Sequence, residues 1–510
     1  MTLKRIVKNL IPLTMVLAMA GNSLTSQGAT VTFTPDTTRV LRNPLQGWVM
    51  YLGRNWDENF WEEKGYDRMT VENGADTVKV SDYASCAYIR TSWVSFEPEE
   101  GQYAWNDPDS RLMKLIRSVN DRGLRIAFRI VIDGRDQGQN TPQYVFDAGA
   151  EGYYDPKAPG MNRSPYPDDP VFQEKYAKFF KAFASHFDDP TKVEFIDAYS
   201  LGKWGESHSM IYKDNSNKER VFDWAIDLAT SCFKRVPMIL HYHRMLGDPD
   251  DDGWGSVPAD AEMLINRAID RGFSLRHDAF GMHGYYQDWE KEMAKKWNFR
   301  RPIIMEGGWI TGAHHRYWRD PSGLYREGHA EDVRKGEYDA SAEARVNMMD
   351  FRINDETRSW FEDAFPLVKK FVAEGGYRLY PHSVSAPQSA RKDSQITVST
   401  EWRNLGWGYC PTNIPQWNQK YKVGVALLNA DGAPVRVVSE MESDLSKWLR
   451  EAPGKYDTVV DLNDVAPGRY TLAVALIDVT QDNEPGLEMA VNPALTVSGW
   501  LPAMNVTIEE

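Results

Sequence analysis

Eight apolar runs alternate with amphipathic stretches between about residue 40 and residue 375, and this alternation constrains the fold of the 510-residue chain more than any other feature. Several of the runs are almost continuously apolar, which is typical of parallel strands that are covered on both faces. The runs cover residues 45–52, 86–93, 124–132, 194–202, 236–243, 277–284, 301–306 and 345–353. We interpret each run as one strand of a common sheet.

Helical patterns fill several of the intervals between these runs. In residues 109–123, Leu112, Leu115 and Val119 recur at helical spacing, and Gly123 ends the pattern. Comparable patterns cover residues 169–187, 218–233, 258–272 and 356–376. Eight strands that alternate with helices predict an α/β fold, the (β/α)8 or TIM barrel, over residues 30–376.

The character of the sequence changes after Gly376. Short alternating segments such as QITVSTEW and KVGVALL are separated by turns rich in Asn, Asp, Pro and Gly. This pattern predicts an antiparallel β-sandwich over residues 377–510. Within it, a long segment carries Trp402, Trp407 and Trp417, and we expect this segment either to bind glycan or to reach toward the barrel as a support.

The N-terminus has the pattern of a secretory signal peptide, which we place at residues 1–20. Three basic residues precede an apolar run that ends in the small-x-small sequence Ala-Met-Ala. This run is too short to span a membrane, and no other segment is long and apolar enough to do so. We therefore expect a secreted protein, located in the periplasm or on the cell surface of a bacterium.

The net charge argues against some classes of partner. The formal charge is −14, and removal of the signal peptide with its three basic residues makes it −17. A chain this acidic is a poor candidate for binding nucleic acid or an anionic membrane. No sequence feature points to a protein partner. The sparse set Cys86, Cys232 and Cys410 forms no metal or redox motif, so we expect free thiols.

Two glutamates stand at the predicted C-terminal ends of strands, where the functional side chains of such barrels gather. Glu306 ends the run RPIIME and is followed by two glycines, and Glu206 lies in the segment LGKWGESH. Glycoside cleavage needs such a pair, since one carboxyl group protonates the leaving oxygen and, in retaining enzymes, the other attacks the anomeric carbon. The alternative role for either glutamate is a salt bridge that closes the rim of the barrel.

On these residues the chain resembles the clan A glycoside hydrolases. Glutamates at the ends of the fourth and seventh strands are the signature of that clan, and the segment WVSFEPEEGQYAW at 93–105 is similar to its W-x-x-x-E-P-x-x-G-x-Y-x-W segment. With NPLQGW at 43–48, the chain also resembles a secreted bacterial barrel-plus-sandwich family of unknown function that lies near the glycoside hydrolases. The resemblance implies a retaining hydrolase of poly- or oligosaccharides, with Glu206 as acid/base, Glu306 as nucleophile and no cofactor.

One position departs from the pattern of the clan. Most clan A enzymes have Asn before the acid/base residue, where it binds the sugar 2-hydroxyl, and this chain has Gly205. In an enzyme, either Arg90 or His208 takes over that contact or the sugar is held differently. The rival interpretation is a glycan-binding surface protein on a degenerate barrel, without turnover. A separation of the two glutamates well beyond about 9–10 Å favours this rival.

Further polar and aromatic residues near the predicted strand ends suit a polyol substrate. We expect substrate to be bound by Arg90, Trp93, Arg129, Asp133, His208, His241, His243, His283, Tyr285 and Trp309. Metal binding by His241 and His243 would need a third ligand such as His283, and we favour sugar contacts, so no metal ion is expected. For the proposed roles, Glu206 should have a raised pKa, and donors such as Arg90 should keep Glu306 ionised.

Overall fold

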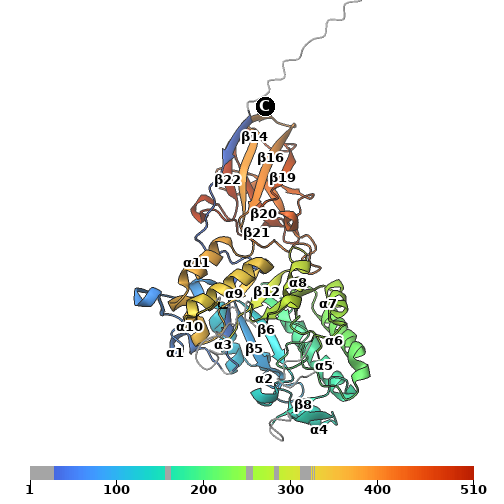
Figure 1. Ribbon diagram of the computed structural model, residues 1–510. Coiled ribbons are helices and arrows are strands. Elements are labelled where there is room, and N and C mark those ends of the chain that lie inside the picture. The colour runs from blue at the N-terminus through green and yellow to red at the C-terminus, as the bar shows by residue number, and fades with distance from the viewer. Residues whose placement is uncertain are drawn as a thin grey trace, which may run out of the picture.

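A computed structural model describes residues 28–54, 56–154, 162–247, 257–280, 286–309, 323, 325–326 and 328–510. The predicted signal peptide at 1–20, His283 and Tyr285 lie outside these residues. The described chain forms a barrel and a sandwich that stack end to end, with the C-terminus at the far end of the sandwich (Figure 1).

Eight parallel strands close into a barrel, which confirms the predicted TIM barrel. Around the barrel the strands are β2 (Gly47–Leu52), β5 (Ala84–Ser92), β6 (Arg125–Val131), β9 (Val193–Asp197), β10 (Met238–His241), β11 (Phe273–Asp278), β12 (Ile303–Glu306) and β13 (Met348–Asp350). β13 pairs with β2, which closes the ring. The prediction of the sixth strand at 277–284 is wrong in position, because Gly272 ends the preceding helix and the strand begins at the next residue.

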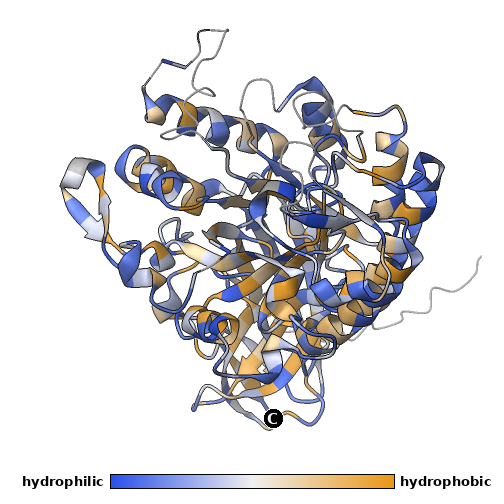
Figure 2. Ribbon diagram, turned by 90° about the horizontal axis from the view of Figure 1, so that it is seen from below, coloured by the Kyte–Doolittle hydropathy of each residue, from blue (hydrophilic) through white to orange (hydrophobic). Residues whose placement is uncertain are grey.

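Helices surround the barrel strands (Figure 2). The longer ones are α3 (Arg111–Asn120), α5 (Pro170–Phe187), α6 (Lys218–Cys232), α7 (Ala261–Asp270), α8 (Asp288–Trp297), α9 (Ala330–Ala344), α10 (Asp355–Glu362) and α11 (Phe365–Glu374). Short helices are α1 (Phe60–Glu63), α2 (Trp93–Phe96) and α4 (Gln143–Asp147). The predicted helix at 356–376 is two helices, because Pro366 in the first turn of α11 lacks the N–H that would continue α10.

The helix α5 shows how the sequence fixes the barrel wall. The side chain of Asp169 caps α5 by accepting a hydrogen bond from the backbone N–H of Phe172 at 2.9 Å. Further along α5, the ring of Phe183 packs edge to face on Phe128 of β6, with 5.4 Å between the ring centres. Each buried phenylalanine contributes about 1.5–3 kcal/mol. This packing fixes the strand that carries Arg129 on its other face.

Two antiparallel sheets form the sandwich, as predicted for the C-terminal part. One sheet contains β1 (Gly28–Thr32), β14 (Leu379–Pro387), β16 (Gln395–Asn404) and β19 (Gly454–Asp461). The other contains β15 (Ser389–Arg391), β22 (Leu501–Glu509), β20 (Gly468–Asp478), β17 (Tyr421–Leu428), β18 (Pro434–Glu440) and β21 (Glu484–Leu487). Because β1 pairs with β14, residues 30–32 belong to the sandwich although the predicted division assigned them to the barrel.

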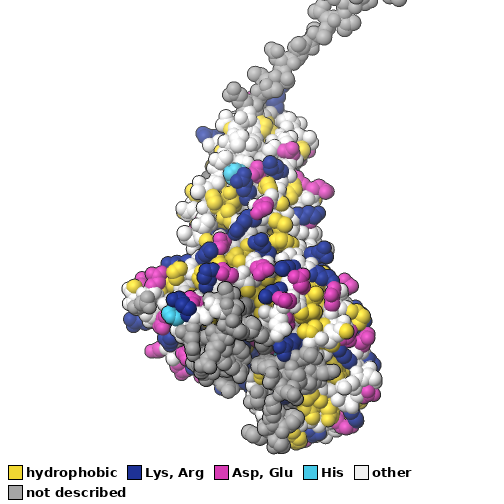
Figure 3. Space-filling view, in the orientation of Figure 1, with side chains coloured by type: hydrophobic (Ala, Val, Ile, Leu, Met, Phe, Trp, Pro, Cys, Tyr) yellow, Lys and Arg dark blue, Asp and Glu magenta, His cyan; other side chains and the backbone are white. Residues whose placement is uncertain are grey.

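The surface mixes both signs of charge. On the face shown in Figure 3, lysine, arginine, aspartate and glutamate side chains are interspersed over both parts among apolar ones. No described helix is long and apolar enough to cross a membrane. Cys86, Cys232 and Cys410 are free thiols, as expected.

The loop between β16 and β17 joins the sandwich to the N-terminal end of the barrel. In this loop Trp407 Nε1 donates to the backbone oxygen of Val346, just before β13, at 2.8 Å, and the indole packs on Tyr338 of α9. Trp402 and Trp417 are also buried. Of the two expected roles for this segment, the contacts therefore favour support of the barrel.

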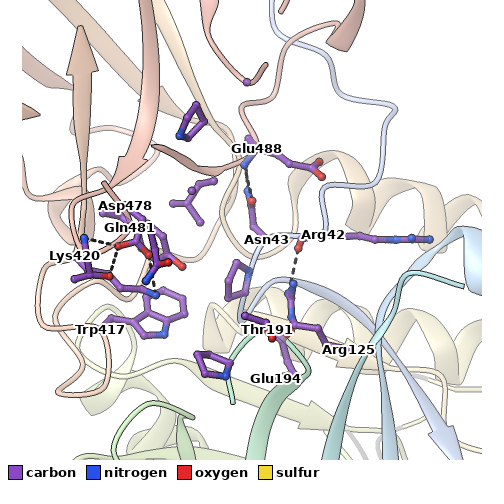
Figure 4. A pocket seen from close by; sticks show the side chains of 18 of the residues that line it. Arg42, Asn43, Arg125, Thr191, Glu194, Trp417, Lys420, Asp478, Gln481 and Glu488 are labelled. Atoms are coloured by element: carbon purple, nitrogen blue, oxygen red, sulfur yellow. Dashed lines mark hydrogen bonds and ion pairs between the residues drawn. The ribbon is translucent and has the colours of Figure 1, made fainter. Parts of the chain in front are cut away.

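A polar cavity of about 850 Å³ lies at the same junction (Figure 4). Arg125 of β6 and Glu194 of β9 form an ion pair at 2.5 Å on its barrel side. On its sandwich side, Lys420 and Asp478 form another at 3.1 Å. The charges in each ion pair neutralise each other, one pair on the barrel side and one on the sandwich side.

Candidate active site

The strand β12 places Glu306 at the C-terminal mouth of the barrel. Glu306 is the last residue of β12, and its side chain is fully buried. The carboxylate accepts hydrogen bonds from Arg129 Nη2 (2.6 Å), Arg276 Nε (3.1 Å) and Arg352 Nη1. Although burial acts to raise the pKa of Glu306, these three guanidinium charges lower it well below its ordinary value. Glu306 is thus ionised as predicted, but its donors do not include Arg90.

A tight loop after β9 carries Glu206. The backbone turns at Gly202 and Gly205, where φ is +86° and +75°. A Cβ atom at Gly205 would lie 3.2 Å from Cδ of Arg129, so the close approach of the loop to the arginine favours glycine at this position. Glycine at position 205 therefore fits both the positive φ and the space beside Arg129. From the same loop, His208 Nε2 lies 3.4 Å from Glu206 Oε2.

One guanidinium group, that of Arg129 on β6, connects the two glutamates. Its Nη1 donates to Glu206 at 2.7 Å and its Nη2 to Glu306 at 2.6 Å, while its Nε donates to Asp197 at 2.9 Å. One oxygen of Glu206 and one of Glu306 lie within 4.8 Å of each other. This upper limit lies below the roughly 6.5–9.5 Å of inverting glycosidases and is compatible with the close pair of carboxyl groups in retaining ones.

Asp278, at the end of β11, is a third carboxyl group in the site. One of its oxygens lies within 4.8 Å of oxygens of both Glu206 and Glu306. Its Oδ1 has no hydrogen-bond partner among the described residues, and Arg352 Nη2 comes only to 4.0 Å from its Oδ2. Burial and the charges of the two glutamates raise the pKa of Asp278 well above its ordinary value, although Arg352 acts against them.

The pKa of Glu206 is lowered, so the expectation of a raised value is wrong. Burial acts to raise this pKa, but the hydrogen bond from His208 and the charge of Arg129 outweigh it. Sequence reasoning missed this because it took into account neither the hydrogen bond from His208 nor the charge of Arg129, which lies on a different strand. Burial and Arg129 also lower the pKa of His241 to about 4. His241 is therefore neutral at pH 7, with its Nε2 3.2 Å from Glu306 Oε2.

The three carboxyl groups have ligand atoms close enough for a metal ion, but their surroundings do not suit one. Glu306 already accepts from three guanidinium groups, and Glu206 accepts from one of them. A metal cation among these fixed positive charges would be repelled. The arginines already supply the positive charge that the carboxylates need.

Two of the predicted binding residues lie beside this site. The Trp309 side chain is 37% exposed, and Arg352 Cζ lies 4.7 Å from the centre of its ring. Since Arg352 also contacts Glu306, Trp309 lies at the edge of the carboxyl groups. Arg90 Nη2 donates to the backbone oxygen of Trp204 at 3.4 Å, so Arg90 holds the loop that carries Glu206.

The prediction that Trp93 faces the site is wrong. Its side chain is fully buried, and its ring centre lies 5.3 Å from that of Phe179 of α5. Its Nε1 donates to Glu97 Oε2 at 2.9 Å. Because β5 ends at Ser92 and α2 begins with Trp93, the helical turn directs the indole into the layer between barrel and helices.

Two more predicted residues have partners away from the glutamates. Asp133 accepts a hydrogen bond from Tyr153 Oη at 2.6 Å and braces the long loop after β6. His243 faces His277 and Glu290. His241 and His243 thus belong to different clusters although they are two residues apart.

Arg276 precedes the predicted sixth strand, and Asp278 lies at its start. Sequence reasoning therefore missed both residues. The available signal was Gly272, which ends the helical pattern immediately before FSLRHD. With the strand placed there, Asp278 falls at its C-terminal end, where functional side chains gather.

Comparisons with known proteins leave the family open. No protein-family model matches the chain, and no curated protein matches it. Among solved structures, the endo-β-1,4-mannanase from Thermotoga petrophila is 10% identical, with 92% of this chain and 98% of that chain covered and a TM-score of 0.39. The catalytic domain of the β-amylase from Paenibacillus polymyxa is 11% identical, with 65% and 99% covered and a TM-score of 0.42. Xylanase 10B from Thermotoga petrophila RKU-1 is 12% identical, with 60% and 82% covered and a TM-score of 0.35. Similarities this low carry no weight for the activity of this chain, which has to be inferred from its own site.

Proposed function

We propose that the protein is a glycoside hydrolase that cleaves glycosidic bonds in a poly- or oligosaccharide by the retaining, two-step mechanism. The observation that carries this proposal is the approach of Glu206 and Glu306 to within 4.8 Å at the C-terminal mouth of the barrel. In the first step Glu306 attacks the anomeric carbon and Glu206 protonates the leaving oxygen. In the second step Glu206 removes a proton from water while the water oxygen attacks the anomeric carbon. The bond between that carbon and Glu306 breaks, and the sugar is released.

The surroundings of Glu306 support its role as nucleophile. An attacking carboxylate has to be ionised, and the three guanidinium groups keep Glu306 in that form. They also fix its position, since both oxygens are hydrogen-bonded. Held in this way, the carboxylate needs little reorganisation before attack.

The surroundings of Glu206 set the conditions under which it can donate a proton. With a lowered pKa, Glu206 is mostly ionised at neutral pH. The proposed donor role therefore gives an enzyme that works best in acid. Asp278 lies within reach of both glutamates and is the group to compare with Glu206 in mutagenesis.

The remaining elements of the proposal concern substrate and location. Trp309 offers a partly exposed ring beside the carboxyl groups, on which the apolar face of a sugar can stack. The N-terminal signal pattern supports secretion to the periplasm or cell surface. The main support for the rival, a glycan-binding protein without turnover, is glycine at position 205. The close approach of Arg129 gives another reason for a glycine at this position.

Trapping the covalent intermediate tests the mechanism. Incubation of the protein with activated 2-deoxy-2-fluoro glycosides of common sugars, followed by intact-mass and peptide mass spectrometry, should give an adduct of one sugar on the peptide that contains Glu306. The Glu306→Gln variant is the control and should give no adduct. Hydrolysis of a natural glycan without any adduct, or an adduct on another residue, would contradict the assignment of Glu306.

A further inference from the structure

A second cluster of titratable side chains lies beside the carboxyl groups and takes no part in the proposed reaction. It contains His243 from the turn after β10, His277 of β11 and Glu290 in the first turn of α8. Each of the three residues is at most 2% exposed. The cluster thus joins two barrel strands to a covering helix.

The ligand atoms of this cluster have the spacing of a tetrahedral metal site. His243 Nδ1 lies 3.3 Å from His277 Nε2 and 3.6 Å from Glu290 Oε1, and the latter two atoms are 4.0 Å apart. Zinc bonds to nitrogen and oxygen of about 2.0–2.2 Å in tetrahedral geometry separate ligand atoms by about 3.3–3.6 Å. A small contraction of the longest edge gives three corners of this tetrahedron, and the fourth would be taken by water or another ligand.

Hydrogen bonds outside the cluster orient two of its members inward. His277 Nδ1 lies 2.5 Å from the backbone oxygen of Asp278, so this nitrogen carries the proton and Nε2 presents its lone pair to the cluster. Glu290 Oε2 accepts from the backbone N–H of Gln287 at 3.0 Å, which leaves Oε1 facing the histidines. Such outer hydrogen bonds are typical of metal-ligating histidine and carboxylate groups.

The charge balance points the same way. Among the residues that the structure describes, no lysine or arginine nitrogen lies within 4.0 Å of the Glu290 carboxylate, whose ion-pair contacts are with the two histidines. A buried carboxylate without a cation is costly. Glu306 differs from Glu290 in this respect, because three guanidinium groups neutralise its charge.

We infer that His243, His277 and Glu290 bind one divalent transition-metal ion, with zinc as the best fit to two imidazoles and one carboxylate in tetrahedral array. This differs from the expectation, from sequence, of no metal. The ion would tie β10, β11 and α8 together next to Asp278, and the ring of His243 also contacts that of His208, with 5.4 Å between centres. The inference does not depend on the proposed hydrolase activity.

Zinc binding tests this inference directly. The full-length mature chain is treated with chelator, dialysed and titrated with Zn²⁺ in competition with a chromophoric chelator, and bound metal is measured by mass spectrometry. We expect about one zinc ion per chain and a rise in Tm of at least about 3 °C. Loading with Co²⁺ should give the visible absorption of a tetrahedral site.

Variants locate the bound metal. His277→Ala and Glu290→Gln should each weaken zinc affinity by more than about 10-fold, while His186→Ala on the exposed side of α5 should bind as the wild type does. Circular dichroism of each apo variant checks that it is folded. Absence of stoichiometric binding by the wild type would overturn the inference. Equal zinc affinity of the wild type and folded Glu290→Gln and His277→Ala would also overturn it.

Discussion

The two ends of the barrel bury charge in different ways. At the N-terminal end, Glu194 of β9 accepts from Arg125 at 2.5 Å and from the backbone N–H of Leu45, and the sandwich lies over this end (Figure 4). At the C-terminal end, Glu306 accepts from three guanidinium groups, and one of these also connects Glu206. The same strands, β6 and β9, supply charged residues to both ends.

Some buried polar atoms of the C-terminal end have no hydrogen-bond partner in the part of the chain that the structure describes. At the C-terminal end, the atoms Asp197 Oδ1, Asp278 Oδ1 and Arg276 Nη1 have no hydrogen-bond partner among the described residues. Buried polar atoms without partners cost about 1–3 kcal/mol each. Such atoms also occur at the N-terminal end, for example Arg39 Nε and Asn347 Oδ1, but at the C-terminal end the hydroxyl groups of a sugar could supply the missing partners. In the proposed account, the N-terminal end stabilises the fold and the C-terminal end carries out the reaction.

Removal of Glu206 should produce the largest change among the variants that sharpen this comparison. Glu206→Ala should lower kcat/KM by about 10³-fold, because both proton transfers lose their group. With an activated aryl glycoside, whose leaving group needs no proton, added azide should restore turnover, since this small anion can occupy the space and attack the glycosyl-enzyme to give a glycosyl azide. Asp278→Asn should lower kcat/KM by only about 10-fold, because in this account the Asp278 carboxyl group transfers no proton. A larger loss for Asp278→Asn, with azide rescue in that variant, would assign the acid/base role to Asp278.

A matched pair of arginines on β6 compares the two ends directly. Arg129→Lys should lower kcat/KM by about 100-fold, because lysine cannot donate to Glu206 and Glu306 in parallel. Arg125→Lys, four residues earlier on the same face, should leave kcat/KM within about 3-fold and lower the free energy of unfolding by about 1–2 kcal/mol. Steady-state kinetics and urea unfolding of both variants measure these effects. Equal losses of activity would show that the two ends do not differ as described.

The pH dependence follows from the direction of two pKa shifts. The pKa of Glu306 is well below its ordinary value, so the nucleophile stays ionised as the pH falls. The pKa of Glu206 is also lowered, so its protonated form increases only as the pH falls. We therefore expect kcat/KM to rise by about 10-fold per pH unit from about pH 8 to about pH 5, because the protonated fraction of a group with a pKa below this range changes by that factor and this profile reports the free enzyme. A profile that falls only above pH 7 would point to a donor with a raised pKa.

The smallest effect on activity is expected at the junction with the sandwich. Trp407→Ala should lower the free energy of unfolding by about 3–5 kcal/mol, because it empties a buried site between the two parts. Turnover per folded molecule should stay within about 2-fold. Trp309→Ala is the control at the other end, and it should raise KM while stability changes by less than about 1 kcal/mol. Loss of turnover in folded Trp407→Ala would mean that the sandwich contributes to the site.

The sequence was sufficient for the barrel because its signals are local. Apolar runs and helical spacing predicted a barrel of eight strands, of which the sixth was misplaced, and the charge in IIMEGG predicted Glu306 at a strand end. The side-chain direction of Trp93 was not predictable, because it depends on where β5 gives way to α2. The lowered pKa of Glu206 was not predicted either, since it depends on the orientation of His208, two residues away, and on Arg129, 77 positions away along the chain. Local changes of structure, such as the one from β5 to α2, and long-range contacts, such as that of Arg129 with Glu206, together account for what sequence reasoning missed.

The most direct test of the central claim is release of sugar by the wild type and by Glu306→Gln. The mature proteins are incubated at acidic and neutral pH with a panel of plant and host glycans, and products are identified by mass spectrometry. The account predicts that the wild type releases sugar from at least one glycan and that Glu306→Gln, although folded, is slower by about 10⁴-fold or more. No release by the wild type from any glycan, with measurable binding of a glycan by both proteins, would contradict the account and establish a binding protein.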